Sequence, residues 1–266
     1  MSGIYAAEII GKRHLGGDTF SIQFHSPAIA AVAKPGEFVM VRPSDIDNGF
    51  DPITPRPYSI YTLIHENGDP IGFSLIIQIL GRGSAAIFDK PVGEKLQCNG
   101  PLGRGLSIDP SRNYIMVAGG TGIAPVAFAA QEMEKSGIDY SILYGGRSKS
   151  YVHLDELSEF GLSAQPATED GSLGHAGLVT ELMKLKLEES DDKDIVFACG
   201  PWNMMRAATH VATEMGVPCL CSLERYMACG FGVCLACIYR KTTDELNHTC
   251  CQEGPVVNGM EVDWDA

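Results

Sequence analysis

The stretch NYIMVAGGTGIAPVAFAAQEMEKSG (Asn113–Gly137) decides the fold of the middle of the chain. An apolar run leads into the glycines of VAGGTGIAP (Val117–Pro125), and the following Val126–Gly137 has helical periodicity and stops at a glycine. A strand that turns through glycines into a helix is typical of parallel α/β sheets. Such a turn also lets a phosphate approach backbone N–H groups at the start of the helix. We therefore predict an α/β domain with a dinucleotide site at this turn.

The alternation of strands and helices continues towards the C-terminus. Strand-like Asp139–Gly146 is followed by a helical stretch around Leu178–Leu187, a strand-like Asp194–Gly200 and a helical Asn203–Gly216. Strands that alternate with helices predict a parallel sheet. The tripeptide CGP (Cys199–Pro201) ends one of these strands, at the edge where open α/β sheets bind ligands. The predicted nucleotide contacts are Gly119, Gly120, Thr121, Gly122, Cys199, Gly200 and Pro201.

Two points of this nucleotide site stay open on the residues alone. Cys199 has a plain alternative role as a small buried side chain. Many dinucleotide sites carry an acid at the end of the second strand, where it binds the ribose. Here Arg147 follows the second strand instead, and it either meets a 2′-phosphate or is solvated. The residues therefore do not decide between NAD and NADP.

The first hundred residues predict an antiparallel β-barrel. Asp18–Phe24 alternates apolar and polar residues, with Phe20, Ile22 and Phe24 on one face. Further short segments are rich in β-branched or aromatic residues and are bounded by Pro, Gly or Asp: Glu37–Val41, Arg56–Thr62 and Phe73–Leu80. Short strands at this spacing favour a barrel, and one helical stretch, Gly83–Lys90, interrupts them.

Two polar stretches of this barrel predict a flavin site. RPYS (Arg56–Ser59) offers a guanidinium for a diphosphate, the Tyr58 ring for stacking and a hydroxyl for a ring nitrogen. GRGS (Gly81–Ser84) opens a helix at Gly83, which gives a second anion-binding turn. Either stretch alone is often only structural. Together they predict FAD, with its diphosphate held by Arg56 and the Gly83–Ser84 turn.

The C-terminal cysteines predict an inorganic cofactor. Cys229-x4-Cys234-x2-Cys237 has the ligand spacing of plant-type [2Fe–2S] ferredoxins, and the two glycines in the wider gap let backbone N–H groups approach the sulfurs. A fourth ligand can come from Cys250 or Cys251, whose side chains point opposite ways in an extended segment. The alternative is a zinc site built from the CxxC pair and the later cysteines. That site would need neither Cys229 nor the glycines.

Composition narrows the class of protein. The chain has 266 residues, enough for more than one domain, and a net charge of -13, which argues against a nucleic-acid partner. We see no signal peptide and no apolar run near the ~20 residues that span a bilayer, so we predict a cytoplasmic protein that does not enter a membrane. Nine cysteines in such a chain favour metal binding over disulfides.

Taken in order, R-x-Y-S, G-x-G-S, GGTGIAP and CGP resemble the ferredoxin–NADP reductase superfamily, from Gly3 to about Met215. The tail LERYMACGFGVCLACIYR…CCQEGPVV closely resembles the electron-transfer subunits of bacterial NAD-dependent dihydroorotate dehydrogenases. This resemblance implies an FAD-binding barrel over residues 1–108, an NAD-binding α/β domain over 109–221 and a small [2Fe–2S] domain over 222–266.

The resemblance also implies site residues. In that family the fourth cysteine ligand precedes an acidic-Gly-Pro-Val stretch, and Cys251 precedes Gln252-Glu253-Gly254-Pro255-Val256 here, with Gln252 where an acid is usual. The implied cluster ligands are Cys229, Cys234, Cys237 and Cys251. The implied FAD contacts are Arg56, Pro57, Tyr58, Ser59, Ile76, Ile77, Gln78, Gly83 and Ser84.

A division of labour follows from the same resemblance. A catalytic, FMN-containing partner subunit would oxidise dihydroorotate in pyrimidine biosynthesis. Electrons would pass singly through the cluster to FAD, which would give a hydride to NAD⁺. No residue of this chain would need to act as an acid or base. Two alternatives stay open: an NAD(P)H–ferredoxin or sulfur-compound oxidoreductase subunit, and a non-enzymatic, zinc-tailed, nucleotide-binding regulator.

Overall fold

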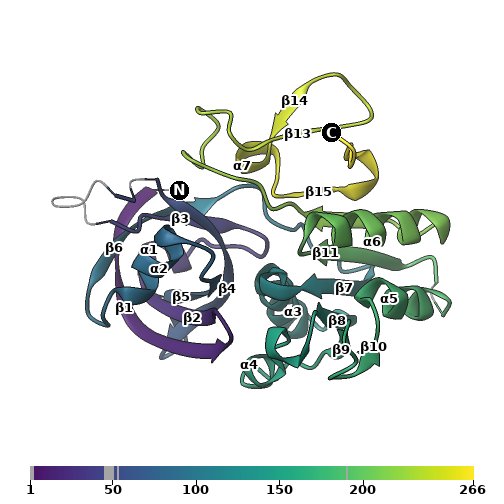
Figure 1. Cartoon of the computed structure of the whole chain (residues 1–266), viewed down its shortest axis with the longest axis horizontal. Helices are drawn as coiled ribbons and strands as arrows, with labels where there is room; N and C mark the ends of the chain where they lie inside the picture. Colours follow the sequence, from purple (N-terminus) through teal and green to yellow (C-terminus); the bar gives the residue numbers. More distant parts are fainter. Residues whose placement is uncertain (1–2, 45–50, 53, 190) are drawn as a thin grey trace.

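A computed structural model describes residues 3–44, 51–52, 54–189 and 191–266. Within these residues the chain forms a closed barrel, a larger mixed sheet with helices on both faces, and a two-stranded sheet in the tail. Figure 1 shows the barrel beside the larger sheet, with the yellow C-terminal tail lying along the edge of both. This arrangement confirms the predicted fold class.

The barrel is antiparallel throughout and has the strand order β1-β2-β5-β4-β3-β6. Pairing of β1 with β6, from Gly3 opposite Gly100 to Glu8 opposite Lys95, closes it. Phe20, Ile22 and Phe24 are buried in the barrel interior, as their alternation predicts. The elements are β1 (Gly3–Gly16), β2 (Thr19–His25), α1 (Pro27–Ala30), β3 (Phe38–Val41), β4 (Arg56–Glu66), β5 (Asp69–Gln78), α2 (Arg82–Asp89) and β6 (Lys95–Leu102).

The larger sheet has the order β10-β9-β8-β7-β11-β12-β15, and its strands are parallel except for β15. Its strands are β7 (Asn113–Gly119), β8 (Tyr140–Gly146), β9 (Gln165–Thr168), β10 (His175–Ala176), β11 (Asp194–Cys199) and β12 (Cys219–Ser222). Its helices are α3 (Ile123–Ser136), α4 (Leu154–Ser158), α5 (Val179–Leu187) and α6 (Trp202–Glu214), with 3-10 turns at Gly120–Gly122 and Lys149–Tyr151. The predicted strands and helices of this region are all present. None of the helices in the described ranges is long and apolar enough to cross a membrane.

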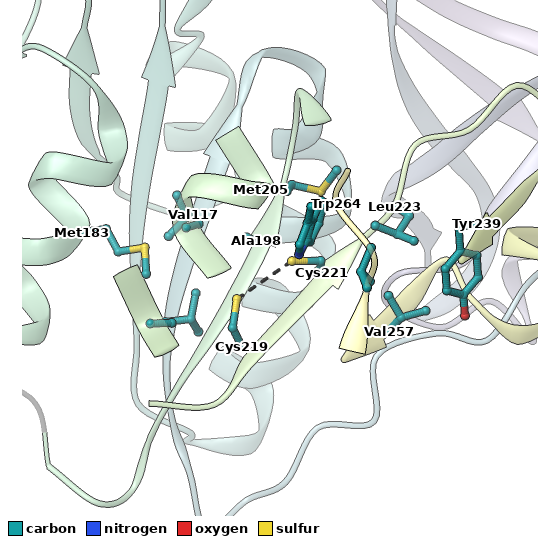
Figure 2. Close-up of a cluster of buried hydrophobic side chains, with 14 of the residues drawn as sticks. Val117, Met183, Ala198, Met205, Cys219, Cys221, Leu223, Tyr239, Val257 and Trp264 are labelled. Carbon is teal, nitrogen blue, oxygen red and sulfur yellow. Dashed lines mark hydrogen bonds between the residues drawn. The ribbon is translucent and has the colours of Figure 1, made fainter. Parts of the chain in front are cut away.

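The tail holds β13 (Ile238–Arg240), β14 (Asn247–Thr249), α7 (Cys250–Glu253), β15 (Val256–Asn258) and the 3-10 turn Gly259–Glu261. It is built into the larger sheet, because β15 pairs antiparallel with β12. Figure 2 shows Tyr239, Val257 and Trp264 of the tail in one apolar cluster with Ala198 of β11 and Met205 of α6. The boundary near residue 222 remains a prediction, but one strand beyond it completes the preceding sheet.

Candidate cofactor cleft and cysteine loop

A cleft of about 730 Å³ opens where the barrel, the larger sheet and the tail meet. Its barrel side carries Arg56, Pro57, Tyr58, Ser59, Ile76 and Gln78. Thr121 and Ala124 face it from the glycine turn after β7, and residues 223–227 of the tail close the third side. Three segments far apart in sequence therefore share one cavity, and two of them were predicted to bind different cofactors.

The Arg56 side chain lies against the helix-opening turn. A Cβ atom on Gly83 would lie 2.7 Å from Nε of Arg56, so the guanidinium passes close to the backbone of this turn. Nη1 of Arg56 also donates to the carbonyl and hydroxyl oxygens of Thr54, both at 2.6 Å. The hydroxyl of Ser84 accepts the backbone N–H of Leu80 at 3.0 Å, so it caps its own helix. A diphosphate here would meet a guanidinium that its neighbours already orient.

Strand alternation sorts the predicted contacts on β5. Ile76 and Gln78 face the cleft, whereas the side chain of Ile77 is fully buried in the barrel core. Successive residues of a strand point to opposite faces, so Ile77 offers only its backbone to a ligand. Nε2 of Gln78 donates to the carboxylate of Asp18 at 3.0 Å, which fixes the amide at the cleft wall.

The two predicted nucleotide turns pack directly on one another. A Cβ on Gly122 would lie 2.2 Å from the carbonyl oxygen of Cys199, and one on Gly119 would lie 2.6 Å from Sδ of Met204. The hydroxyl of Tyr144 donates to the carbonyl of Gly120 at 3.1 Å, which holds the turn from β8. Gly122 thus permits the close approach of one turn's backbone to the other's, and Gly119 leaves room for the side chain of Met204.

Cys199 itself is buried at the end of β11. Burial raises the pKa of its thiol well above the usual value, and the nearby charge of Glu224 acts in the same direction. The side chain is therefore a neutral thiol between the two turns. This position fits both the predicted nucleotide contact and the plain packing role.

The cysteine loop is shaped to receive thiolate ligands. Sγ of Cys229 accepts the backbone N–H groups of Phe231 at 3.5 Å and Cys234 at 3.4 Å. Burial works against ionisation of Cys229, but these N–H groups outweigh it and lower the pKa of the thiol to about 7. Gly230 and Gly232 have φ values of 79° and 85°, a region that side chains disfavour. The glycines therefore permit the curvature that aims N–H groups at sulfur.

The four implied ligands form two pairs. The thiol of Cys229 interacts with that of Cys234, and the thiol of Cys251 with that of Cys237. The charge of Cys229 also reaches Cys251. Among the described residues, no three His, Cys, Asp or Glu side chains converge on a single-ion position. Four thiols are the ligand number of a [2Fe–2S] cluster and also of a tetrahedral zinc ion.

Cys250 and Cys251 differ in direction. The thiol of Cys250 donates to the carbonyl of Leu223 at 3.4 Å. Burial raises its pKa strongly, whereas the charge of Arg225 acts in the opposite direction. The thiol of Cys251 faces Cys237 and the N–H of Gly232, and burial is the main cause that raises its pKa to about 12. This geometry supports Cys251 over Cys250.

Sequence reasoning missed two charged residues of the cleft, Glu224 and Arg225. Burial raises the pKa of the Glu224 carboxyl to about 7, although its side chain is exposed by surface area. Glu224 lines the cleft, so its exposed surface is turned to the cavity. The sequence signal that could have identified Glu224 and Arg225 is a pair of adjacent charged residues just after an apolar strand.

Apolar side chains surround the exposed end of the cysteine loop. Cys234 is the exposed member of the four proposed ligands. The large hydrophobic side chains exposed in its part of the tail are Phe231 at 50%, Val233 at 74%, Leu235 at 61%, Ile238 at 41% and Leu246 at 66%. Large apolar side chains exposed in this way are typical of interaction surfaces.

The barrel, the parallel sheet and the cleft between them define a ferredoxin-reductase-like oxidoreductase with an iron–sulfur segment. Residues 116–210 match the oxidoreductase NAD-binding domain family. Residues 224–263 match the family described as the iron-sulfur cluster binding domain of dihydroorotate dehydrogenase B.

Relatives along the whole chain give the same result. A dihydroorotate dehydrogenase B (NAD(+)) electron transfer subunit from Desulforamulus reducens is 32% identical over 100% of both chains. A homologue of that subunit from Thermotoga maritima is 33% identical over 100% of this chain and 90% of its own. The chain belongs to the family of dihydroorotate dehydrogenase B electron transfer subunits.

A solved structure is also similar over the full length. It is described as an NADH-dependent reduced ferredoxin–NADP oxidoreductase that carries out flavin-based electron bifurcation, with a TM-score of 0.85, 31% identity, and coverage of 100% of this chain and 92% of that one. The chain is thus an oxidoreductase subunit, and its cofactors are a [2Fe–2S] cluster, FAD and NAD. The zinc-tailed regulator that the sequence left open does not fit these findings.

Proposed function

We propose that this chain passes electrons to NAD⁺ in pyrimidine biosynthesis. The electrons come from a catalytic, FMN-containing partner subunit that oxidises dihydroorotate. One observation carries the proposal: the segment that closes the cleft runs directly into the cysteine loop. Residues 223–227 line the cleft, and Cys229 follows two residues later. The two sites are therefore joined by a few residues of one segment.

The residues that hold each group are part of this proposal. A bound [2Fe–2S] cluster carries one electron at a time, and FAD converts single electrons into hydride transfer. The cluster ligands are Cys229, Cys234, Cys237 and Cys251, supported by the paired thiols. Arg56 and the Gly83 turn hold the FAD diphosphate, and the Gly119–Gly122 and Cys199–Pro201 turns hold NAD. The domain boundaries at 108/109 and 221/222 are proposed with these sites.

Glu224 is placed to supply a proton for the reduction of NAD⁺, a role that the sequence did not predict. Reduction of NAD⁺ consumes two electrons and one proton, but electrons that enter singly through cysteine-held iron bring no proton. Glu224 lines the cleft and its carboxyl has a pKa of about 7 because of burial. We assign it the task of holding the proton that each turnover takes up, with the exposed neighbouring Tyr226 marking the way to water.

The Glu224 assignment has a direct test. Glu224→Gln should slow NAD⁺ reduction by roughly a hundred-fold, the usual effect of losing a proton-transfer group, with NAD affinity unchanged. Glu188→Gln, at an exposed acid just after α5, is the matched control. An unchanged rate and pH profile in Glu224→Gln would remove Glu224 from the mechanism.

The partner is proposed to dock on the exposed apolar side chains around Cys234. This surface lies where electrons must enter, and its side chains are large and solvent-exposed. We further propose a cytoplasmic protein without a nucleic-acid partner, supported by the net charge of -13 and nine free cysteines.

Reconstitution tests the whole proposal. The isolated chain should oxidise NADH with an artificial acceptor and should not oxidise dihydroorotate. Addition of the catalytic subunit should then link dihydroorotate oxidation to NAD⁺ reduction. If no catalytic subunit co-purifies or restores this link, the proposed substrate is wrong.

A second candidate function is favoured by one observation. The solved structure that matches this chain over its full length belongs to an NADH-dependent ferredoxin–NADP oxidoreductase. In that case the partner would handle ferredoxin and NADP instead of dihydroorotate. Mixing the chain with each type of partner and following NADH formation separates the two functions.

A further inference from the structure

Arg225 lies where the cleft wall continues towards the cysteine loop, and the mechanism above does not use it. Its guanidinium carbon is 4.0 Å from the ring centroid of Trp202, the first residue of α6. The Trp202 ring packs on Trp264 with centroids 4.6 Å apart, and its Nε1 donates to the carbonyl of Trp264 at 3.1 Å. The arginine head group is thus held against a fixed pair of rings.

Arg225 takes part in no ion pair among the described residues. Its Nε is buried without a hydrogen-bond partner. Arg206, on the same helix as Trp202, shows the contrast, because it pairs with Asp265 at 2.8 Å. A partly buried cation without a counter-charge is costly. The missing negative charge therefore points to a bound group.

Sites for anionic groups lie on two sides of this residue. On one side Arg225 lines the cleft. On the other side α7 packs on the same segment, because the Cys250 thiol donates to the carbonyl of Leu223, two residues before Arg225, at 3.4 Å. Cys251, a proposed ligand, is the next residue. A cluster held by four thiolates is anionic, and an added electron makes it more so.

We propose that Arg225 is the counter-charge shared by the cleft and the cysteine loop, and that it raises the electron affinity of both sites. A positive charge stabilises the reduced state of a neighbouring site more than the oxidised state, because the attraction grows with each added electron. With the screening typical of protein interiors, a unit charge about 10 Å away changes such an equilibrium roughly ten-fold. Arg225 acts on potentials and takes no part in bond making. The inference rests on the proposed cofactor sites.

Redox titration of the full-length, cofactor-loaded chain tests this role. The cluster is followed by electron paramagnetic resonance and the flavin by visible absorption. Arg225→Gln should weaken electron binding roughly ten-fold at each site, which is about 59 mV for the one-electron couple and about 30 mV for the two-electron couple. Arg225→Lys keeps the charge and should keep both potentials. Arg206→Gln removes a charge that Asp265 already balances and should change neither.

Each outcome decides the matter. Unchanged potentials in Arg225→Gln, a shift at one site only, or an equal shift in Arg206→Gln would overturn the shared counter-charge. If Arg225→Gln loses iron or FAD while Arg225→Lys retains both, the charge is needed to hold the groups, which supports the proposal; equal loss in both variants overturns it. Neither dihydroorotate nor the partner is present, so the result does not depend on the identity of the electron donor.

Discussion

The nucleotide turns and the cysteine loop both depend on glycine, but for different reasons. Gly122 permits contact with the Cys199 carbonyl, and its own φ of -61° is one that any residue adopts. Gly230 and Gly232 have positive φ values, and their Cα atoms face side chains of Met40 and Gln252. The first site is therefore shaped by the sheet beneath it. The second is shaped by its own backbone and by what packs on it.

This contrast predicts that the cysteine loop depends on its bound group more than the nucleotide turns do. The turns lie between β7, β11 and α3, which are buried where they meet the turns. The loop is partly exposed, and regular structure begins only at β13. Loss of a ligand should therefore affect the loop most.

The largest expected effect is loss of the cluster, and it should differ between substitutions of the adjacent Cys250 and Cys251. Cys251→Ser should lose the cluster, because its thiol faces Cys237. Cys250→Ser should retain iron near two atoms per chain, because the Cys250 thiol is turned to Leu223. Iron analysis and the visible spectrum give the answer. Iron loss from Cys250→Ser alone would reverse the ligand assignment.

Alanine substitutions at Gly122 and Gly230 test the contrast between the nucleotide turns and the cysteine loop. Gly122→Ala puts a Cβ 2.2 Å from a backbone carbonyl, so it should impair NAD binding and lower stability by roughly 1–3 kcal/mol. Gly230→Ala puts a Cβ 2.5 Å from Cγ of the buried Met40 and imposes a strained φ of 79°. It should spare NAD binding and loosen the cluster. Measurement of NAD affinity and iron content in both variants should show opposite losses, and parallel losses would contradict the contrast.

Flavin binding should respond more moderately. Arg56→Ala removes a charged contact that contributes on the order of 1.5–3 kcal/mol, so FAD retention should weaken roughly ten- to a hundred-fold. FAD released on dilution is the measurement. Full FAD occupancy after dilution would remove Arg56 from the diphosphate site.

The smallest effect concerns pH and the tail. His248 contacts Glu253 through Nδ1 at 2.5 Å and Asp244 through Nε2 at 3.0 Å. The hydrogen bond to Glu253 and then that to Asp244 raise the pKa of His248 above its usual 6.5. A raised pKa means that the protonated histidine stabilises the fold, so this contribution is present below pH 6.5 and is lost as pH rises through the raised value.

Thermal unfolding followed across this pH range is the measurement. The unfolding midpoint should fall slightly as the pH rises past 6.5, and His248→Gln should flatten that part of the profile. An identical pH profile in the variant would show that the contacts of His248 contribute nothing to the tail.

Much of this architecture was predictable because its signals are local. The glycine turn after β7, the alternation in β2 and the cysteine spacing each report on neighbouring residues. β1 and β6 were not predicted, because Gly3–Gly16 contains little regular alternation and is a strand only through its pairing with β2 and β6. β15 was missed for the same reason, since its three residues form a strand only by pairing with β12.

The residues of the site also divide into those with a local sequence signal and those that depend on tertiary packing. Arg56, Thr121 and Cys229 lie in motifs that carry their own chemistry. Glu224 and Arg225 belong to no such motif, and they matter because the barrel, sheet and tail meet around them. Tertiary packing also changes the best experiment. A truncation near Ser222 would remove β15 from the sheet, so single cysteine substitutions test the tail more cleanly.

The most direct test of the account uses a complex of the catalytic subunit with the Cys251→Ser chain. The quantity measured is the rate at which NAD⁺ is reduced to NADH with dihydroorotate as the electron donor. The variant must first be shown to retain FAD and to oxidise NADH with an artificial acceptor, which confirms an intact cleft. The account predicts that dihydroorotate-dependent NADH formation is abolished while the NADH–acceptor reaction continues. A full rate of NADH formation without the cluster would show that the cysteine loop is not the route by which electrons reach the cleft.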